Sequence, residues 1–185
     1  VVVHCAGAVG FWGSYEHFHQ GNVTVTENVV DGCLKQQVKR LVHLSSPSIY
    51  FDGKAHVAIK EEQVPKHFFD HYGKTKYLAE QQVFGAQEFG LEVLVLRPRS
   101  VIGAGDTSIF PRMINMQRKG HLSIIGNGLN KVDFTSVQNL NDALFSALLA
   151  AGPALGKAYN ISNGAPVPPW DVINYMLRQM DVPPV

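Results

Sequence analysis

The stretch HYGKTKYLAEQQV at residues 71–83 places a tyrosine four residues before a lysine, at the start of an expected amphipathic helix. Residues four apart lie on one face of a helix, so the Tyr72 phenol and the Lys76 ammonium can be neighbours. A phenol beside a cation can exchange a proton with the oxygen of an alcohol or a ketone. The same residues are also compatible with an ordinary solvated helix face, because a single short spacing often arises by chance. The rest of the chain must decide.

The bulk composition is typical of a soluble globular protein. The 185 residues are 45% hydrophobic and 17% charged, enough for one domain with a sizeable core. Sixteen basic residues nearly balance fifteen acidic ones and form no run longer than a pair, so we expect no nucleic-acid partner. No stretch approaches the ~20 apolar residues of a membrane span, and no secretory signal opens the chain. Cys5 and Cys33 lack metal-ligand spacing, so we expect no metal site and two core thiols in a reduced, cytoplasmic protein.

The first hundred residues alternate between strand and helix patterns. Short apolar runs predict strands over residues 1–5, 40–46 and 92–98, and three- to four-residue periodicity predicts helices over 15–37 and 72–89. Gly90 is expected to end the second helix, and Pro98 to end the third strand. This order predicts an α/β fold, a doubly wound parallel sheet with right-handed crossovers.

Beyond Pro98 the pattern is looser. We expect helices over residues 107–120, 139–151 and 169–180 and strands over 122–128, 131–137 and 157–162. Residues 1–105 are therefore assigned to the sheet domain. Residues 106–185 are assigned to a mixed segment, with a small substrate-binding lobe and elements that return to the sheet.

Polar and small residues follow each strand of the first half. Ligands of open parallel sheets bind beyond the carboxyl ends of the strands, so these are the places where a site is expected. Ala6, Gly7 and Ala8 follow the first strand and allow a ligand to approach the backbone closely. Ser45 and Ser46 place hydroxyl groups at the end of the second strand.

Six segments occur in an order and spacing that resembles the extended short-chain dehydrogenase/reductase family, within the NAD-dependent epimerase/dehydratase superfamily. They are HCAGAVG, NVTVTENVV, RLVHLSSPSIY, YGKTKYLAEQ, LRPRSVIGAGD and KAYNISNGAPV. Each segment alone is weak, but six in register are strong. The likeness is greatest to the 3β-hydroxysteroid dehydrogenase-like branch, followed by sugar-nucleotide epimerases and dehydratases. It implies a Rossmann-like domain, NAD or NADP as cofactor and a small-molecule substrate.

The resemblance assigns the catalytic roles. Tyr72 is implied as the proton donor or acceptor, Lys76 as the cation that tunes it and holds a ribose hydroxyl, and Ser46 as the group that orients the substrate oxygen. Ser45 and Ser48 are alternatives for the serine. A free phenol has a pKa of about 10, and lowering it by ~2–3 units requires about 3–4 kcal/mol. Lys76 and an oxidised nicotinamide are expected to provide this stabilisation.

Further site residues follow from the same resemblance. Asn22 matches the family's helix asparagine, which supports the active-site backbone, although a plain polar helix residue is the alternative. Ala6, Gly7, Ala8, Tyr72, Lys76, Pro98, Ser100 and Val101 match positions beside the cofactor. For Pro98, Ser100 and Val101 the alternative is a structural loop.

Four other residues are ambiguous. Phe11 and Trp12 are compatible with a substrate pocket or with the core. His4 is expected to be a buried core histidine, and His71 a solvated one.

The family's G-x-x-G-x-x-G fingerprint does not occur in the chain. The glycines of GAVGFWG at residues 7–13 follow the strand that matches the family's fourth, so they do not replace it. The chain also starts within a strand and without an initiator methionine. We therefore expect it to be part of a longer protein whose upstream half holds the phosphate loop. The resemblance further implies a homodimer formed through the two long helices.

Three functions fit these observations. The first is an NAD(P)-dependent oxidoreductase that interconverts a hydroxyl and a ketone on a sterol-like or long-chain 3-oxo substrate. The second is a sugar-nucleotide epimerase or dehydratase that uses the same serine, tyrosine and lysine. The third is a non-catalytic remnant of the fold.

Overall fold

The computed structural model describes residues 1–10, 12–124 and 126–185. The chain forms two compact units, one of residues 1–98 and 142–161 and the other of residues 99–141 and 162–185. The first boundary therefore falls after Pro98, and residues 142–161 belong with the sheet. Phe11 lies outside the described residues.

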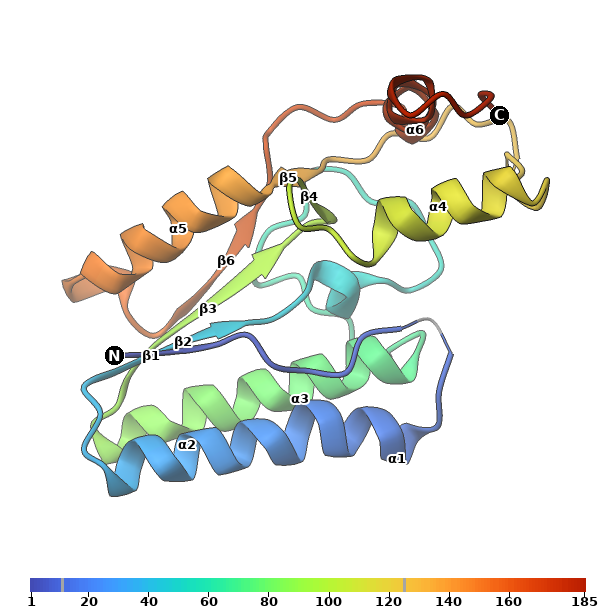
Figure 1. The fold of residues 1–185 in the computed structure, drawn as a ribbon. Helices are drawn as coiled ribbons and strands as arrows, with labels where there is room; N and C mark the ends of the chain where they lie inside the picture. Colours follow the sequence, from blue (N-terminus) through green and yellow to red (C-terminus); the bar gives the residue numbers. More distant parts are fainter. Residues whose placement is uncertain (11, 125) are drawn as a thin grey trace. The chain divides into compact units, whose positions relative to one another are not determined.

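The first unit is built on a four-stranded parallel sheet in the order β1-β2-β3-β6 (Figure 1). Its strands are β1 (Val2–His4), β2 (Arg40–Leu44), β3 (Glu92–Pro98) and β6 (Lys157–Ile161). The strands expected at 1–5, 40–46, 92–98 and 157–162 are thus confirmed, as is the doubly wound α/β class. Strand β3 lies between β2 and β6, and its residues 93–96 are apolar and buried, as expected for a central parallel strand.

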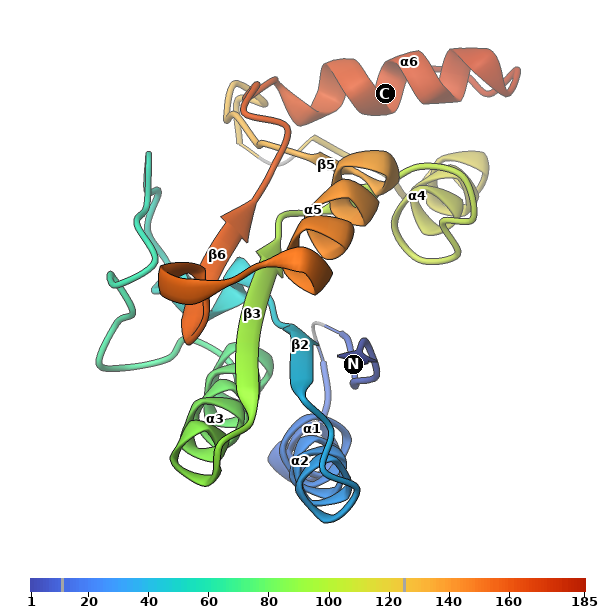
Figure 2. The ribbon, with the colours of Figure 1, turned by 90° about the vertical axis from the view of Figure 1, so that its left-hand side faces the viewer.

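Helices cover both faces of this sheet. A continuous helical segment runs through α1 (Tyr15–Phe18), η1 (His19–Thr24) and α2 (Val25–Lys35), which confirms the helix expected over 15–37. Its middle part, η1, is a π-helix, which the periodicity did not predict. The helices α2 and α3 (His71–Gly85) pack on one face, and α5 (Val137–Leu149) packs on the other (Figure 2).

Each face has its own core. On the α2 and α3 side, Leu41, Val93 and Val95 of the sheet pack against helix residues that include Val30 and Val83. On the α5 side, the alternate residues of the same strands form a second core, in which Val42 and Leu94 pack against Ala147. Period-two alternation explains why one strand contributes to both cores.

Helix α3 forms most of the helix expected over 72–89. The Asp70 carboxylate caps it by accepting a hydrogen bond from the Gly73 N–H at 2.6 Å. The short helix η3 (Ala86–Phe89) continues from α3 and ends at Gly90, whose φ of 86° is left-handed. Gly90 is therefore the expected C-cap.

The second unit is formed around two helices, α4 (Ile109–Arg118) and α6 (Pro169–Gln179), whose apolar faces share a core. Strand β4 (Val101–Ile102) pairs in parallel with β5 (Thr135–Ser136). The strand expected over 122–128 is wrong, because no described residue of that segment is in a strand. Gly126 and Gly128 adopt φ values of 70° and 69°, which extended strands do not use.

Burial bears on the expectations for the two cysteines, Trp12 and two histidines. Cys33 is buried as predicted, but Cys5 is exposed. Trp12 is 90% exposed, so it is not a core residue. His4 is buried and His71 is exposed, as expected. Within the described part of the chain, no helix combines the length and apolar character that a bilayer crossing requires.

Candidate functional site

The first unit gathers polar side chains at the carboxyl end of β2. Leu44 is the last residue of this strand, and Ser45 and Ser46 follow it. Ser46 has an extended backbone and caps the short helix η2 (Pro47–Tyr50), accepting from the Ser48 N–H at 3.2 Å. Its hydroxyl also donates to the Ser48 hydroxyl at 3.1 Å. The local hydrogen bonds thus hold Ser46 in one orientation.

Helix α3 approaches this strand end closely. A Cβ atom on Gly73 would lie 2.7 Å from the Ser48 carbonyl oxygen, closer than backbone atoms tolerate. Glycine at this position therefore permits the first turn of α3 to pack against η2. This packing is what places Tyr72 and Lys76 beside the end of β2.

Lys76 is buried although it is charged. Its Nζ donates a hydrogen bond of 2.7 Å to the carbonyl oxygen of Leu44. Burial lowers the pKa of Lys76 to about 8, against the opposing influence of Glu80 and Cys5. An ammonium has three N–H donors, so two remain for a ligand after the bond to Leu44.

Tyr72 is directed to the same strand end but to a different partner. Its phenol is hydrogen-bonded with the Ser46 side chain, and its ring lies 5.9 Å from the ring of Phe18. Burial raises the pKa of Tyr72, the Ser46 hydrogen bond opposes this rise, and Asp70 adds to it. In the polypeptide without a cofactor, burial is the largest influence on the pKa of this phenol. The lowering expected from Lys76 together with an oxidised nicotinamide stays a prediction. In the protein alone Tyr72 is the protonated, proton-donating form at neutral pH.

Asn22 lies in the π-helix η1, fully buried. Its side-chain amide donates to the Thr75 hydroxyl at 3.1 Å, and its backbone carbonyl accepts from the Thr26 hydroxyl at 2.6 Å. The bond to Thr75 ties η1 to the helix that carries Tyr72 and Lys76, whereas the bond from Thr26 lies within the same helical segment. Asn22 thus lies against helix α3, and its predicted role in supporting the active-site backbone stays a prediction.

The segment after β1 lies close to the same region, beside Asn22 and Lys76. A Cβ atom on Gly7 would lie 2.9 Å from Asn22 Oδ1 and 3.8 Å from Lys76 Nζ. Asn22 Oδ1 is buried and has no hydrogen-bond partner among the described residues, and Ser45 Oγ shares this property. Ala6 and Gly7 are exposed and Ala8 is half-buried. A small backbone cradle, an unpaired acceptor and a lysine with spare donors fit a ligand rich in hydroxyl groups.

The remaining predicted cofactor residues lie at the end of β3 and in the second unit. Pro98 is the last residue of segment 1–98 of the first unit, whereas Ser100 and Val101 belong to the second unit. Ser100 has a φ of 39°, an unusual value for a residue other than glycine. Its carbonyl oxygen accepts from the Thr135 N–H at 3.3 Å, and Val101 pairs with Thr135. Their predicted cofactor contacts stay predictions.

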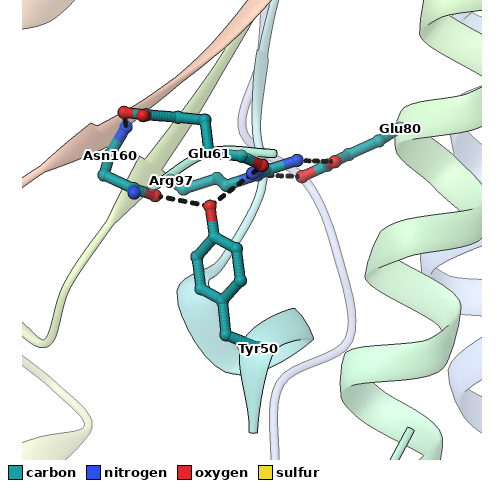
Figure 3. Close-up of polar contacts among 5 residues, drawn as sticks. All are labelled: Tyr50, Glu61, Glu80, Arg97 and Asn160. Atoms are coloured by element: carbon teal, nitrogen blue, oxygen red, sulfur yellow. Dashed lines mark hydrogen bonds and ion pairs between the residues drawn. The ribbon is translucent and has the colours of Figure 1, made fainter. Parts of the chain in front are cut away.

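Sequence reasoning missed a buried polar cluster in the first unit. Arg97 is 3% exposed inside the apolar strand β3, and it pairs with Glu80, which is fully buried on α3 (Figure 3). A signal existed in the sequence, because a lone arginine within EVLVLRP interrupts a strand that must be buried on both faces. Glu80 follows Lys76 by one helical turn, which is a second signal.

Comparison with protein families gives a match to the NAD dependent epimerase/dehydratase family over residues 1–162. A 2-alkyl-3-oxoalkanoate reductase from Stenotrophomonas maltophilia (strain K279a) is 38% identical, covering 100% of this chain and 58% of that protein. The sterol-4-alpha-carboxylate 3-dehydrogenase, decarboxylating, of Bos taurus is 36% identical, covering 97% of this chain and 52% of that protein. The chain thus spans a little over half the length of these curated relatives.

Solved structures show the same fold. A UDP-glucuronic acid 4-epimerase from Bacillus cereus in complex with NAD superposes with a TM-score of 0.84 at 24% identity, covering 98% of this chain and 60% of that one. MoeE5 in complex with UDP-glucuronic acid and NAD superposes with a TM-score of 0.82 at 26% identity, covering 98% of this chain and 62% of that one. The arrangement of sheet, helices and strand-end residues, together with the match over residues 1–162, shows that this chain belongs to the NAD dependent epimerase/dehydratase family.

Proposed function

We propose that the full-length protein is an NAD(P)-dependent oxidoreductase that interconverts a hydroxyl group and a ketone, with Tyr72 as the proton-transferring residue. One observation carries this proposal: Tyr72 and Lys76, on one helix, both reach the carboxyl end of β2, where their partners are Ser46 and the Leu44 carbonyl. Carboxyl ends of parallel strands are where ligands of such sheets bind.

The proton step follows from the state of Tyr72. Because burial raises the pKa of Tyr72, its phenol is protonated at neutral pH and can donate to a carbonyl oxygen. In the direction of reduction, a hydride adds to the carbonyl carbon while the oxygen takes the Tyr72 proton, which yields an alcohol and a phenolate. Solvent returns a proton to the phenolate. A bound nicotinamide dinucleotide supplies the hydride for reduction and accepts it in oxidation.

Lys76 stabilises the charge that this step creates. Its ammonium is buried, so its attraction for a phenolate on the same helix face is screened less than on a surface. The two N–H donors not used by Leu44 fit ribose hydroxyl groups, and Gly7 leaves room for them. Ala6 and Ala8 on either side of Gly7 extend the cradle. These residues would hold the cofactor in the first unit.

Ser46 and Asn22 have supporting roles in this proposal. The Ser46 hydroxyl, hydrogen-bonded with the Tyr72 phenol, is the group that would orient the substrate oxygen. Ser48 bonds with Ser46 and does not itself reach Tyr72 through any hydrogen bond found among the described residues. Asn22 fixes the helix under the site through Thr75.

The substrate class is proposed from the relatives. A 2-alkyl-3-oxoalkanoate reductase and a sterol-4-alpha-carboxylate 3-dehydrogenase both have names that place a ketone or hydroxyl at carbon 3. We extend this to a sterol-like or long-chain 3-oxo substrate for this protein. The second candidate, a sugar-nucleotide epimerase or dehydratase, is favoured by the likeness to a structure of MoeE5 with UDP-glucuronic acid and NAD.

One experiment separates the two candidates. The full-length protein is mixed with NADH or NADPH and a long-chain 2-alkyl-3-oxo acid, and separately with NAD and UDP-glucuronic acid. Net loss of nicotinamide absorbance at 340 nm (the wavelength at which reduced nicotinamide absorbs) in the first mixture supports the oxidoreductase. Conversion of the UDP-sugar without net absorbance change supports the epimerase. No reaction in either mixture, and no thermal stabilisation by any of the four nicotinamide dinucleotides, would overturn both.

A further inference from the structure

The Arg97 guanidinium joins its own strand, β3, to three other segments of the first unit. Its Nε and Nη2 donate to the two carboxylate oxygens of Glu80 on α3, at 2.9 and 2.6 Å. Its Nη1 donates to the Tyr50 hydroxyl in η2 and, at 2.9 Å, to the carbonyl oxygen of Glu61 (Figure 3). A planar guanidinium with five donors is suited to such a junction, and a lysine is not.

The contacts continue to the neighbouring strand. The Tyr50 hydroxyl donates to Asn160 Oδ1 of β6 at 2.8 Å, and the Asn160 N–H donates to the Glu61 carboxylate at 2.8 Å (Figure 3). The Asn160 side-chain amide donates to the Ile59 carbonyl at 3.1 Å. The long irregular segment over residues 51–70 is therefore fixed in its middle by β3 and β6.

These anchored segments flank the residues of the proposed site. Tyr50 follows Ser46 by four residues, and Glu80 follows Lys76 by four and Tyr72 by eight. Residue Glu61 lies between η2 and α3, within the segment that connects Ser46 to Tyr72. Arg97 thus holds the chain before and after Tyr72 and Lys76, and after Ser46, without being one of these residues.

We propose that Arg97 and Glu80 are positioning residues, whose buried ion pair sets the placement of Lys76, Tyr72 and Ser46 at the end of β2. This inference rests on the proposed function, because it assigns a role in the same site. A misplacement of about 1 Å far from the reacting atoms lowers turnover strongly, so the pair affects rate as well as folding.

Glu80 also acts on Lys76 through its charge. The ionisable groups that face Lys76 are Glu80 from α3, His4 and Cys5 from the β1 segment, and His43 from β2. Burial lowers the pKa of each histidine and raises that of Cys5, so all three are neutral at pH 7. Glu80 is therefore the anion that favours the charged form of Lys76.

A second arginine–glutamate pair gives a matched control. Arg40 donates to Glu92 at 2.9 and 2.6 Å and also to the Ala147 carbonyl. Arg40 and Glu92 are the first residues of β2 and β3, so this pair lies at the amino ends of the strands. It has similar chemistry on the same sheet but lies at the end opposite to the proposed site.

The test compares Glu80→Gln/Arg97→Met with Arg40→Met/Glu92→Gln in the full-length protein. Removing both charges of a buried pair avoids leaving an unpaired charge, so both double variants are expected to fold. We expect Glu80→Gln/Arg97→Met to lower kcat by about 10- to 100-fold with a smaller change in KM. Without the Glu80 charge, Lys76 should lose its proton at a lower pH. The decline of activity at alkaline pH should therefore begin at a lower pH than in the wild-type protein. The control pair should leave kcat and the pH profile unchanged.

A second readout needs no activity. Trypsin cleavage at Lys54, Lys60 and Lys66, all exposed in the 51–70 segment, should be faster in the Glu80→Gln/Arg97→Met variant than in the control. Tyr50→Phe, which removes no charge, should give a smaller change in the same direction. Wild-type kcat and wild-type cleavage in Glu80→Gln/Arg97→Met, or equal losses in both double variants, would overturn the positioning role. Absence of turnover in the wild-type protein would overturn the proposed function alone, because cleavage still reports on the pair.

Discussion

Lys76 and Leu44 are joined by a 2.7 Å hydrogen bond from the ammonium to the backbone carbonyl, which fixes helix α3 to the end of β2. The bond puts a positive charge in a buried environment, and the protein bears the cost of desolvating it. In the proposed site this desolvation is useful, because a weakly solvated ammonium interacts strongly with a newly formed phenolate.

The pKa of Lys76 gives a test of this burial through stability. Burial lowers the pKa of Lys76 from 10.5 to about 8, so the unfolded chain binds more protons than the folded chain between these values. Stability due to Lys76 therefore rises with pH across this window. Compared with Lys76→Met, the wild-type protein should gain about 3 kcal/mol in free energy of unfolding between pH 7.5 and 10.5.

Urea denaturation at pH 7.5, 9 and 10.5 measures this difference. Lys74→Met, at an exposed position of the same helix, is the control for removing a lysine. A wild-type minus Lys76→Met difference that stays constant over the three pH values would show that Lys76 is not desolvated in the folded protein.

Asn22 is expected to contribute to stability through its bond with Thr75. Asn22→Ala removes a buried hydrogen bond and leaves a small cavity, so it should cost about 1–3 kcal/mol. Gln20→Ala, at an exposed position of the same π-helix, should change stability by less than about 0.5 kcal/mol. Denaturant midpoints at unchanged slope provide the measurement, and equal effects of the two substitutions would contradict the assigned contact.

Gly7 is expected to tolerate no side chain. Gly7→Ala would place a methyl group 2.9 Å from Asn22 Oδ1, and the resulting overpacking should cost about 1–3 kcal/mol. The same methyl group would narrow the proposed ribose cradle, so the affinity for NAD(H) or NADP(H) should fall as well.

Gly32→Ala is the matched control for Gly7→Ala. A Cβ atom on Gly32 meets nothing within 4 Å, and the residue lies inside α2. Alanine should stabilise this helix by about 0.5–1 kcal/mol and leave cofactor affinity unchanged. A Gly7→Ala variant that binds the cofactor as tightly as Gly32→Ala would remove Gly7 from the cradle.

Much of the sheet was predictable because its signals are local. An apolar run such as residues 93–96 must be buried on both faces, and Gly90 marks the end of a helical segment. The strand expected over 122–128 failed because apolar residues alone do not distinguish a strand from a glycine-rich turn.

The structure brings Tyr72, Lys76 and Ser46 together at the end of β2, as expected from the sequence, but their electrostatics were not predictable. The spacing of Tyr72 and Lys76 suggests direct tuning, but in the structure Lys76 bonds to Leu44 and burial dominates the pKa of Tyr72. Contacts between residues distant in sequence, such as Tyr50 with Asn160, leave no spacing signal in one chain.

The most direct measurement is the turnover of Tyr72→Phe in the full-length protein, with Tyr77→Phe as its control. Tyr77 lies on the same helix, and its ring packs against Phe68 at 5.1 Å. Loss of the Tyr72 proton should reduce kcat by at least about 100-fold, while calorimetric affinity for NAD(H) or NADP(H) is largely retained. Tyr77→Phe should keep near-normal turnover. A Tyr72→Phe variant that turns over at the rate of Tyr77→Phe would contradict the assignment of Tyr72 as the proton donor.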